Sequence, residues 1–509
     1  MRFGFIIDHS RCIGCHACTV ACKEEHNVPI GVFRTWVKYI EKGDYPDTKR
    51  HFAVLRCNHC DDAPCVEICP TIALFHRPDG IVDFDGERCI GCKSCMQACP
   101  YDALYIDPDS GTAAKCNYCA HRIEAGLEPA CVIVCPEQAI IAGDLDDPAG
   151  KIGRIVATQK TSARKPEKKT RPKLYYIGVE EDLLRPGTLQ VQSTHLWAEK
   201  RGDGSARAAD DGKGRIASGG AREVYDVAHP QPWGRKIALY LWTKSIAAGV
   251  LLVAALLFHR SDEAERWLLS QLSPMLALIF IGITAFLLIF DLKRPERFYY
   301  LLTKPNLKSW LVWGGYILML YSLAAFLWLL AGISDHSVPA ILLWLTAVLA
   351  AASACYSAFL FAQAKGRDLW QSRFFLWHLL LQAIAAGSAV LIIFGAVLGP
   401  APGLIILLGK LLGISLALTL VMILAEMSFA HRSEDAARAA DILSKGPLSA
   451  GFWGLVVGLG TLVPLLLLVA SVFQGMTSPL TVLAALFGLV GLWFFEDLWV
   501  KAGQAVPLS

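Results

Sequence analysis

The sequence carries almost no net charge, because 48 Lys and Arg residues stand against 45 Asp and Glu residues and the sum is +3. This balance provides no bulk attraction to nucleic acid, which is therefore excluded as a default partner. Charged residues are also few, at 18% of 509 residues, against 54% hydrophobic residues. With a mean hydropathy of +0.42, this composition argues against a purely water-soluble protein.

Cysteine is nearly absent from most of the chain. Sixteen of the 17 cysteines lie between Cys12 and Cys135, and the last, Cys355, stands alone in an apolar run. The composition predicts a sulfur-rich domain at residues 1–155, a basic and then flexible linker at 156–232, and a membrane domain at 233–509. Within the linker, residues 174–179 predict a short strand. The seven Lys and Arg residues before it predict a solvated face or a contact with anionic lipid.

The sixteen cysteines form four successive groups of four, in the order tight, loose, tight, loose. The two tight groups share intervals of two, two and three residues, and the alternation indicates an internal duplication. The tight groups are Cys12, Cys15, Cys18, Cys22 and Cys89, Cys92, Cys95, Cys99, and the looser groups are Cys57, Cys60, Cys65, Cys69 and Cys116, Cys119, Cys131, Cys135.

This spacing predicts iron–sulfur clusters. Three cysteines two residues apart can place their thiolates on different corners of one cubane, and Gly14 and Gly91 let the backbone bend closely around it. The fourth cysteine of such a group typically binds the other cluster of a two-cluster ferredoxin. Sixteen cysteines then supply four ligands to each of four [4Fe-4S] clusters, and no cysteine of the domain is left over.

Disulfides and zinc are the alternatives for these cysteines. Disulfides require an oxidising compartment, and residues Met1 to Ser10 do not have the pattern of a signal peptide. Zinc sites usually consist of paired Cys-x2-Cys knuckles rather than three cysteines in a run followed by a fourth. We therefore expect an α+β, ferredoxin-like domain that holds several clusters.

The apolar runs after residue 236 are long enough to cross a bilayer, which takes about 20 residues per helix. They predict an all-α polytopic domain of eight transmembrane helices, which places both chain ends on one side of the membrane. The expected spans are 237–258, 267–290, 310–331, 338–361, 374–398, 404–429, 452–473 and 480–500.

The charges of the loops predict the orientation of this domain. Fourteen Lys and Arg residues flank the spans on the side of the N-terminus, whereas only Arg260 and Arg266 lie on the opposite side. The positive-inside rule then places the iron–sulfur domain on the cytoplasmic face of a bacterial inner membrane. A basic loop that docks an iron–sulfur domain would produce the same count in either compartment, and this alternative stays open.

The four cysteine groups resemble the four-cluster iron–sulfur subunit of complex iron–sulfur molybdoenzymes, such as dimethyl sulfoxide, polysulfide, tetrathionate and nitrate reductases. The resemblance implies that the first three cysteines of one group join the last cysteine of its partner group. We number the four implied ligand sets in the following order: set one is Cys12, Cys15, Cys18 and Cys135; set two is Cys116, Cys119, Cys131 and Cys22; set three is Cys57, Cys60, Cys65 and Cys99; set four is Cys89, Cys92, Cys95 and Cys69.

Several segments of the apolar region resemble the polysulfide-reductase-type membrane subunit, the NrfD family. They include DLKRPERF at 291–298, YSAFL at 356–360, AKGR at 364–367 and AGQ at 502–504. The resemblance implies a fusion of two usually separate subunits, with a quinone site at the membrane face nearest the iron–sulfur subunit and no haem. The residues also argue against a bis-histidine haem, because His259, His336, His378 and His431 all lie at or near span ends.

Quinone chemistry needs a proton donor or acceptor beside a carbonyl oxygen, and ionisable groups inside a membrane are functional candidates by default. Tyr356 lies where the family has its quinone tyrosine and is the first candidate. The other candidates are Lys244, Asp291, Arg294 and His378, with snorkelling or loop anchoring as the alternative role. Lys410, Glu426, Glu496 and Asp497 lie deeper in their spans and predict either a proton route or mutual pairing.

The sequence has no room for a substrate-converting domain, because the linker is shorter than a pterin-binding fold of ordinary domain size. We therefore expect an electron-transfer and membrane-anchor subunit of a quinone-linked respiratory oxidoreductase. The resemblance implies a separate molybdopterin catalytic subunit that contains molybdenum or tungsten. Two alternatives stay open: a redox-driven proton-translocating subunit, and a membrane anchor without quinone chemistry.

Overall fold

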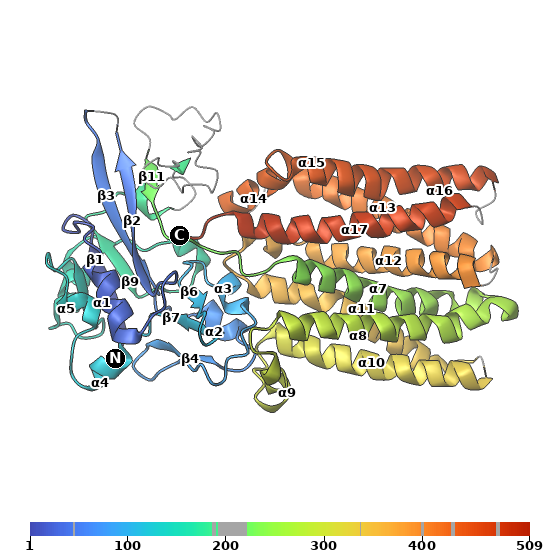
Figure 1. Ribbon diagram of the computed structural model, residues 1–509, viewed down its shortest axis with the longest axis horizontal. Coiled ribbons are helices and arrows are strands. Elements are labelled where there is room, and N and C mark those ends of the chain that lie inside the picture. Colours follow the sequence, from blue (N-terminus) through green and yellow to red (C-terminus); the bar gives the residue numbers. More distant parts are fainter. Residues whose placement is uncertain are drawn as a thin grey trace, which may run out of the picture. The chain divides into compact units, whose positions relative to one another are not determined.

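The computed structural model describes residues 1–43, 46–185, 190–191, 221–335, 337–398, 402–428, 433–474 and 479–509. Two compact units divide the chain: unit 1 consists of Met1–Pro230 with Pro507–Ser509, and unit 2 consists of Gln231–Val506. Figure 1 shows the elements of both units. Residues 192–220 of the expected linker at 156–232, and the histidines His336 and His431, lie outside the described residues.

Unit 1 contains a three-stranded sheet with β1 (Phe3–Asp8) in the middle. β8 (Ile140–Asp144) pairs antiparallel with one edge of β1, and β9 (Leu174–Ile177) pairs parallel with the other. The apolar centre of β1 is buried, as expected for a strand that is covered on both faces. β9 confirms the short strand expected at 174–179. Because β9 completes this sheet, unit 1 extends beyond the expected domain end at residue 155.

A second sheet of unit 1 has the strand order β10–β11–β2–β3. β2 (Thr35–Lys42) and β3 (Lys49–Arg56) form its antiparallel hairpin. β11 (Arg222–Tyr225) pairs antiparallel with β2, and β10 (Gln190–Val191) pairs parallel with β11. Two short hairpins join β4 (Leu74–His76) with β5 (Val82–Phe84) and β6 (Leu104–Ile106) with β7 (Ala113–Lys115).

Short helices accompany the cysteine groups of unit 1. They are α1 (Ala17–His26), α2 (Pro64–Ile68), α3 (Ser94–Ala98), α4 (Ala120–Glu124) and α5 (Ala130–Ile133). A further helix, α6 (Lys151–Thr158), packs on β8 and buries Ile152. Small strands and short helices of this kind confirm the expected α+β, ferredoxin-like class.

Three cations of the basic run before β9 are buried, so the expectation of a solvated face is wrong for them. They are Arg164, Lys165 and Lys173. Lys173 Nζ lies 3.2 Å from Asp61 Oδ1, and Arg164 Nη2 donates to the carbonyl oxygen of Leu508 at 2.9 Å. Their partners are far away in the sequence, so a reading of local charge could not identify them.

His229 joins two distant segments of unit 1 through its two ring nitrogens. Nδ1 lies 2.6 Å from Asp102 Oδ2, and Nε2 lies 3.3 Å from Asp226 Oδ2. Burial lowers the pKa of His229, but the hydrogen bonds to Asp102 and Asp226 outweigh burial and raise the pKa from 6.5 to about 9. The folded state therefore holds a proton that the unfolded chain releases at lower pH.

Raising the pH through 9 is expected to loosen the region around β11. The stabilisation by protonated His229 is complete below pH 6.5, the value for the unfolded chain, and is lost as the pH rises through about 9. The loss amounts to at most about 3 kcal/mol. Hydrogen exchange of residues 222–230, corrected for the intrinsic pH dependence, measures it in the whole chain. A His229→Gln variant should lack this pH dependence, and an identical pH profile in both proteins would contradict the assignment.

Unit 2 contains, within the described residues, eight helices that are long and apolar enough to cross a membrane. They comprise α7 (Arg235–Leu257), α8 (Ser273–Asp291) preceded by the π-helical η6 (Leu268–Leu272), α10 (Trp310–Asp335), α11 (Ala340–Gln363), α12 (Phe375–Leu398), α13 (Pro402–Ser428), α16 (Val463–Gln474) preceded by the π-helical η9 (Phe452–Leu462), and α17 (Pro479–Ala505). Three shorter helices are α9 (Tyr300–Thr303), α14 (Glu434–Ser444) and α15 (Ser449–Gly451). The expected all-α polytopic domain with eight spans is confirmed.

α7 is the most buried of the eight spans, and it packs against α8, α11, α12 and α17 (Figure 1). A Cβ atom on Gly249 would lie only 1.8 Å from the carbonyl oxygen of Ala383, so glycine is what lets α7 and α12 approach at this point. The central position of α7 brings its polar side chains into contact with the neighbouring spans.

Candidate functional site

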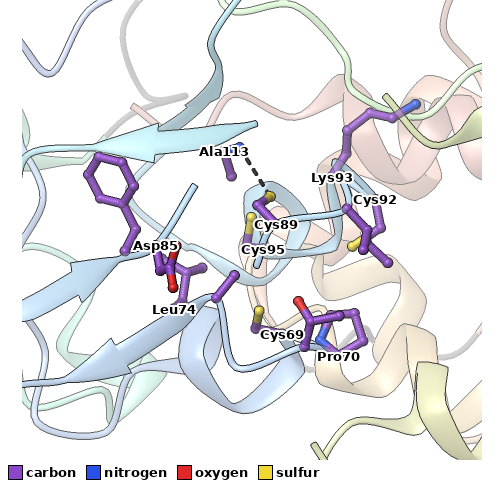
Figure 2. Close-up of a pocket in the computed structure, with 13 residues that line it drawn as sticks. Cys69, Pro70, Leu74, Asp85, Cys89, Cys92, Lys93, Cys95 and Ala113 are labelled. Carbon is purple, nitrogen blue, oxygen red and sulfur yellow. Dashed lines mark hydrogen bonds between the residues drawn. The ribbon is translucent and has the colours of Figure 1, made fainter. Parts of the chain in front are cut away.

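None of the seventeen cysteines forms a disulfide. One cavity of unit 1 is lined by the four cysteines of set four, Cys69, Cys89, Cys92 and Cys95 (Figure 2). Cys69 follows α2, whereas the other three come from the loop before α3 and from α3 itself. The chain therefore brings a cysteine of a loose group to the first three cysteines of the next tight group.

A second cavity of unit 1 is lined by the four cysteines of set one, Cys12, Cys15, Cys18 and Cys135. Apolar side chains from β2, β3 and β8 close its walls, among them Val37, Val54 and Ile140. Both cavities contain the four members that the resemblance implies. That each of these sets binds a cluster stays a prediction.

For sets two and three, we compare which cysteines lie close enough to act electrostatically on one buried cysteine of each set. Cys22 has Cys116, Cys131 and Cys119 as its cysteine neighbours, all from set two. Cys65 has Cys99, Cys57 and Cys60 as its cysteine neighbours, all from set three. The first cysteine neighbours of Cys18 and Cys116 belong to other sets, namely Cys131 and Cys57, so the full membership of sets two and three stays a prediction.

Backbone amides point at several of these sulfur atoms. The N–H groups of Gly91 and Ala113 donate to Cys89 Sγ at 3.4 and 3.3 Å (Figure 2 shows the second contact), and Ala139 N–H donates to Cys135 Sγ at 3.3 Å. Gly14 and Gly91 have φ values of 69° and 68°, which confirms the sharp backbone bend expected at both glycines. Four thiols around a cavity, with amide donors directed at sulfur, fit a negatively charged iron–sulfur cluster.

Set one lies nearest to the surface of unit 1. Cys15 is exposed, and Cys12 and Cys135 are partly exposed, whereas all members of sets two and three are buried. Large apolar side chains beside set one are also exposed, with Val20 on α1 at 65% and Ile133 on α5 at 56%. Because α1 packs against α5, these side chains form an apolar surface next to set one.

In unit 2, Lys244 and Tyr356 lie together in a fully buried polar cluster between α7 and α11. Lys244 Nζ donates to the carbonyl oxygen of Ala354 at 2.7 Å and to Ser357 Oγ at 2.9 Å. The same Nζ lies 4.8 Å from the centre of the Tyr356 ring. Tyr240 OH and Ser357 Oγ lie 3.1 Å apart and share a hydrogen bond. The structure thus joins the first two candidates for quinone chemistry.

Two buried carboxylates lie near these candidates, Glu496 near the Lys244 cluster and Glu426 near His378. Glu496 is an electrostatic neighbour of Lys244, and neither of its carboxylate oxygens has a hydrogen-bond partner among the described residues. His378 Nε2 lies 3.3 Å from Glu426 Oε2, and both side chains are buried. One ionisable pair, His378 with Glu426, and one buried carboxylate that acts electrostatically on Lys244, Glu496, therefore lie inside the helix bundle.

The other candidates lie apart from these groups. Asp291 ends α8 and is partly exposed, and Arg294 follows in the same loop, where its Nη1 lies 3.5 Å from Glu296 Oε1. Lys410 is exposed on α13. Asp497 pairs with Lys501, with 2.5 Å between Oδ2 and Nζ.

Sequence reasoning missed Tyr240 and Ser357 as members of the Lys244 cluster. A signal was present for both. Tyr240 precedes Lys244 by one helical turn on α7, so the two side chains share a face. Ser357 lies next to Tyr356 in the YSAFL segment that carried the family resemblance.

Comparison with known proteins finds family models that match both units. The family model "Polysulphide reductase, NrfD" matches residues 223–507, "4Fe-4S dicluster domain" matches 48–145, and "4Fe-4S binding domain" matches 9–25. The N-terminal part is similar to a tetrathionate reductase subunit of Salmonella typhimurium, with 42% identity over 202 residues, which are 39% of this chain and 80% of the relative.

Two further relatives match the same part of the chain. A polysulfide reductase component of Wolinella succinogenes is 41% identical over 181 residues, which are 35% of this chain and 94% of the relative. Protein NrfC of Escherichia coli is 43% identical over 180 residues, which are 35% of this chain and 81% of the relative. The NrfD match covers more than half of the 509 residues. The chain therefore belongs to the polysulphide reductase NrfD family and is a multi-pass membrane protein with 4Fe-4S binding domains fused ahead of its membrane unit.

Proposed function

We propose that this protein passes electrons through four [4Fe-4S] clusters between a separate catalytic subunit and membrane quinone. The observation that carries the proposal is the pair of four-cysteine cavities in a chain whose other unit belongs to the NrfD family. The relatives of unit 1 are named as parts of tetrathionate and polysulfide reductases, which supports a role in an oxidoreductase complex.

The thiolates of the four cysteine sets would each hold one cluster. When bound, each cluster supplies one-electron storage at a potential that depends on charge, hydrogen bonds to sulfur and exposure. The amides of Gly91, Ala113 and Ala139 stabilise negative charge on the sulfur atoms, and the apolar walls exclude water. The surface-exposed set one is the point where electrons enter or leave unit 1.

The catalytic partner docks on the apolar surface beside set one. A short distance from a partner's redox centre to an exposed cluster favours electron transfer, and Val20 and Ile133 provide apolar area for the contact. By likeness to the named reductase subunits, the partner is a molybdopterin enzyme with molybdenum or tungsten.

The Lys244 cluster handles the quinone. Reduction of a quinone adds two electrons and two protons and yields a quinol. Tyr356 OH donates a hydrogen bond or a proton to one carbonyl oxygen, and Lys244 supplies positive charge where negative charge develops. His378 with Glu426 exchanges protons with the site, and the carboxylate of Asp291 at the end of α8 is a second group that can do so. Arg294 keeps its proton and supplies fixed positive charge. No haem takes part in this scheme.

The iron–sulfur unit faces the cytoplasm in this proposal. The support is the excess of Lys and Arg in the loops on the side of the N-terminus, which the positive-inside rule assigns to the cytoplasmic side of the inner membrane. In this proposal the eight spans are surrounded by membrane lipid.

The test uses anaerobically purified protein in lipid vesicles. Dithionite should reduce the clusters, and a soluble quinone should then reoxidise them within seconds, followed by the visible absorbance of the iron–sulfur centres. Analysis of iron, acid-labile sulfide and zinc precedes the experiment. Zinc in place of iron would overturn cluster binding, whereas clusters that stay reduced after quinone addition would favour an anchor without quinone chemistry.

Proton translocation is a second candidate function. Glu496 favours it, because a buried carboxylate without a hydrogen-bond partner among the described residues, beside Lys244, can take up and release a proton inside the bundle. The same vesicles, loaded with a pH-sensitive dye, distinguish the two functions. More protons moved per electron than quinone chemistry consumes would establish translocation, and an equal number would exclude it.

A further inference from the structure

Arg56 is the last residue of β3 and directly precedes Cys57 of set three. Its side chain is 1% exposed, which makes it one of the largest fully buried side chains of unit 1. A guanidinium stays charged at any physiological pH, so its burial costs free energy unless negative charge lies close to it. Its Nε and Nη2 atoms are buried without a hydrogen-bond partner among the described residues.

Cysteines provide the surroundings of this guanidinium. Arg56 Nη1 donates to Cys131 Sγ at 3.0 Å, and Cζ lies 4.7 Å from the centre of the Phe5 ring. Cys116 and Cys18 are its next cysteine neighbours in electrostatic strength. Cys131 and Cys116 belong to set two, whereas Cys18 belongs to set one. A single buried cation therefore lies beside two of the four cysteine sets.

We propose that Arg56 is a shared counter-charge for the clusters of sets one and two, and that it raises the reduction potential of both. The inference rests on the proposed binding of clusters by these sets. Reduction adds one electron to a cluster, makes and breaks no bond, and leaves Arg56 with its single positive charge. A nearby cation stabilises the more negative, reduced form more than the oxidised form.

The geometry also predicts a different change in reduction potential for each set. Set two is expected to respond most, because Arg56 donates a hydrogen bond to its Cys131. Set one is expected to respond less, because Cys18 is an electrostatic neighbour of Arg56 and the hydrogen bond of Arg56 goes to set two. Set four, whose cavity is lined by Cys69, Cys89, Cys92 and Cys95 without Arg56, is the internal reference.

The test is a redox titration of the full-length protein, followed by electron paramagnetic resonance, with Arg56→Gln against the unchanged protein. Serine substitution of one cysteine in each set assigns the signals. At a fixed potential, the ratio of reduced to oxidised set-two cluster should fall at least tenfold, which is a shift of about 59 mV for one electron. The set-one potential should fall by less, and the set-four potential should stay unchanged.

Matched variants distinguish the effect of the positive charge of Arg56 from the effect of its side-chain shape. Arg56→Lys retains the charge and should retain most of the potential. Arg164→Gln removes another buried guanidinium of unit 1, one that donates to the carbonyl oxygen of Leu508, and should shift none of the potentials. Iron and sulfide are measured in every variant. If Arg56→Gln loses iron, Arg56→Met replaces it, because an apolar side chain of similar length avoids an unpaired polar group.

Each outcome supports or overturns the inference. Full iron content with unchanged potentials in the neutral variants overturns it, as does an Arg56→Lys shift as large as that of Arg56→Gln. Loss of iron in both neutral variants but not in Arg56→Lys supports it, because the sets then need the charge. Loss of iron in Arg56→Gln, Arg56→Met and Arg56→Lys overturns it, because cluster binding then requires the shape of the arginine side chain and not its charge. Absence of clusters from the unchanged protein would instead refute the proposed function itself.

Discussion

Substitution of Cys69 by alanine is expected to abolish the same cluster signal as substitution of Cys95, although 26 positions separate the two in the sequence. Both cysteines line one cavity with Cys89 and Cys92. Loss of one of four [4Fe-4S] clusters lowers the iron content by about a quarter. Electron paramagnetic resonance of the dithionite-reduced protein and iron analysis measure the two effects together.

Cys65 provides the matched control for this prediction. It lies four residues before Cys69 in the same loose group and is equally buried, but its neighbours belong to set three. Cys65→Ala should therefore abolish a different signal, and Cys355→Ala should leave the iron content unchanged. If Cys65→Ala and Cys69→Ala abolish the same signal, the groups do not cross and the assignment of the sets is wrong.

Tyr356→Phe and Lys244→Met are each expected to slow quinone-dependent reoxidation of the clusters by about 100-fold or more, the usual size of a lost proton donor or acceptor. In the proposed quinone site, the hydroxyl of Tyr356 and the ammonium of Lys244 are the groups that interact with a quinone carbonyl. Reduction of the clusters by dithionite should be unchanged, because unit 1 keeps all its cysteines. Stopped-flow absorbance in vesicles measures both rates.

Two control variants match these substitutions. Tyr321 is also a fully buried tyrosine of unit 2, but its hydroxyl donates to the carbonyl oxygen of Ala247, so Tyr321→Phe should keep quinone turnover. Lys410 is exposed on α13, and Lys410→Met should keep it as well. Unchanged turnover in Tyr356→Phe would place the quinone elsewhere, whereas equal losses in Tyr356→Phe and Tyr321→Phe would indicate damage to the bundle.

Local patterns predicted much of this protein. The intervals between cysteines anticipated the bends at Gly14 and Gly91, because a tight loop around a bulky group requires positive φ within a few residues. The lengths of the apolar runs anticipated all eight spans, since a bilayer of fixed thickness sets a minimum helix length. The individual partners of buried charges were not predictable in this way. Lys173 and Asp61, or Lys244 and Ser357, approach only after the chain has folded.

The sequence by itself determined the number and spacing of the cysteines, the division into a sulfur-rich and an apolar part, and the count of the spans. Each of these follows from residue type and short-range periodicity. Only the tertiary structure decided that Arg56 donates a hydrogen bond to Cys131 and that Lys244 donates one to Ser357, which in turn is hydrogen-bonded to Tyr240. The physical reason is that a buried charge is stabilised by whatever polar group the fold brings within a few ångströms, and separation along the chain places no limit on which group that is.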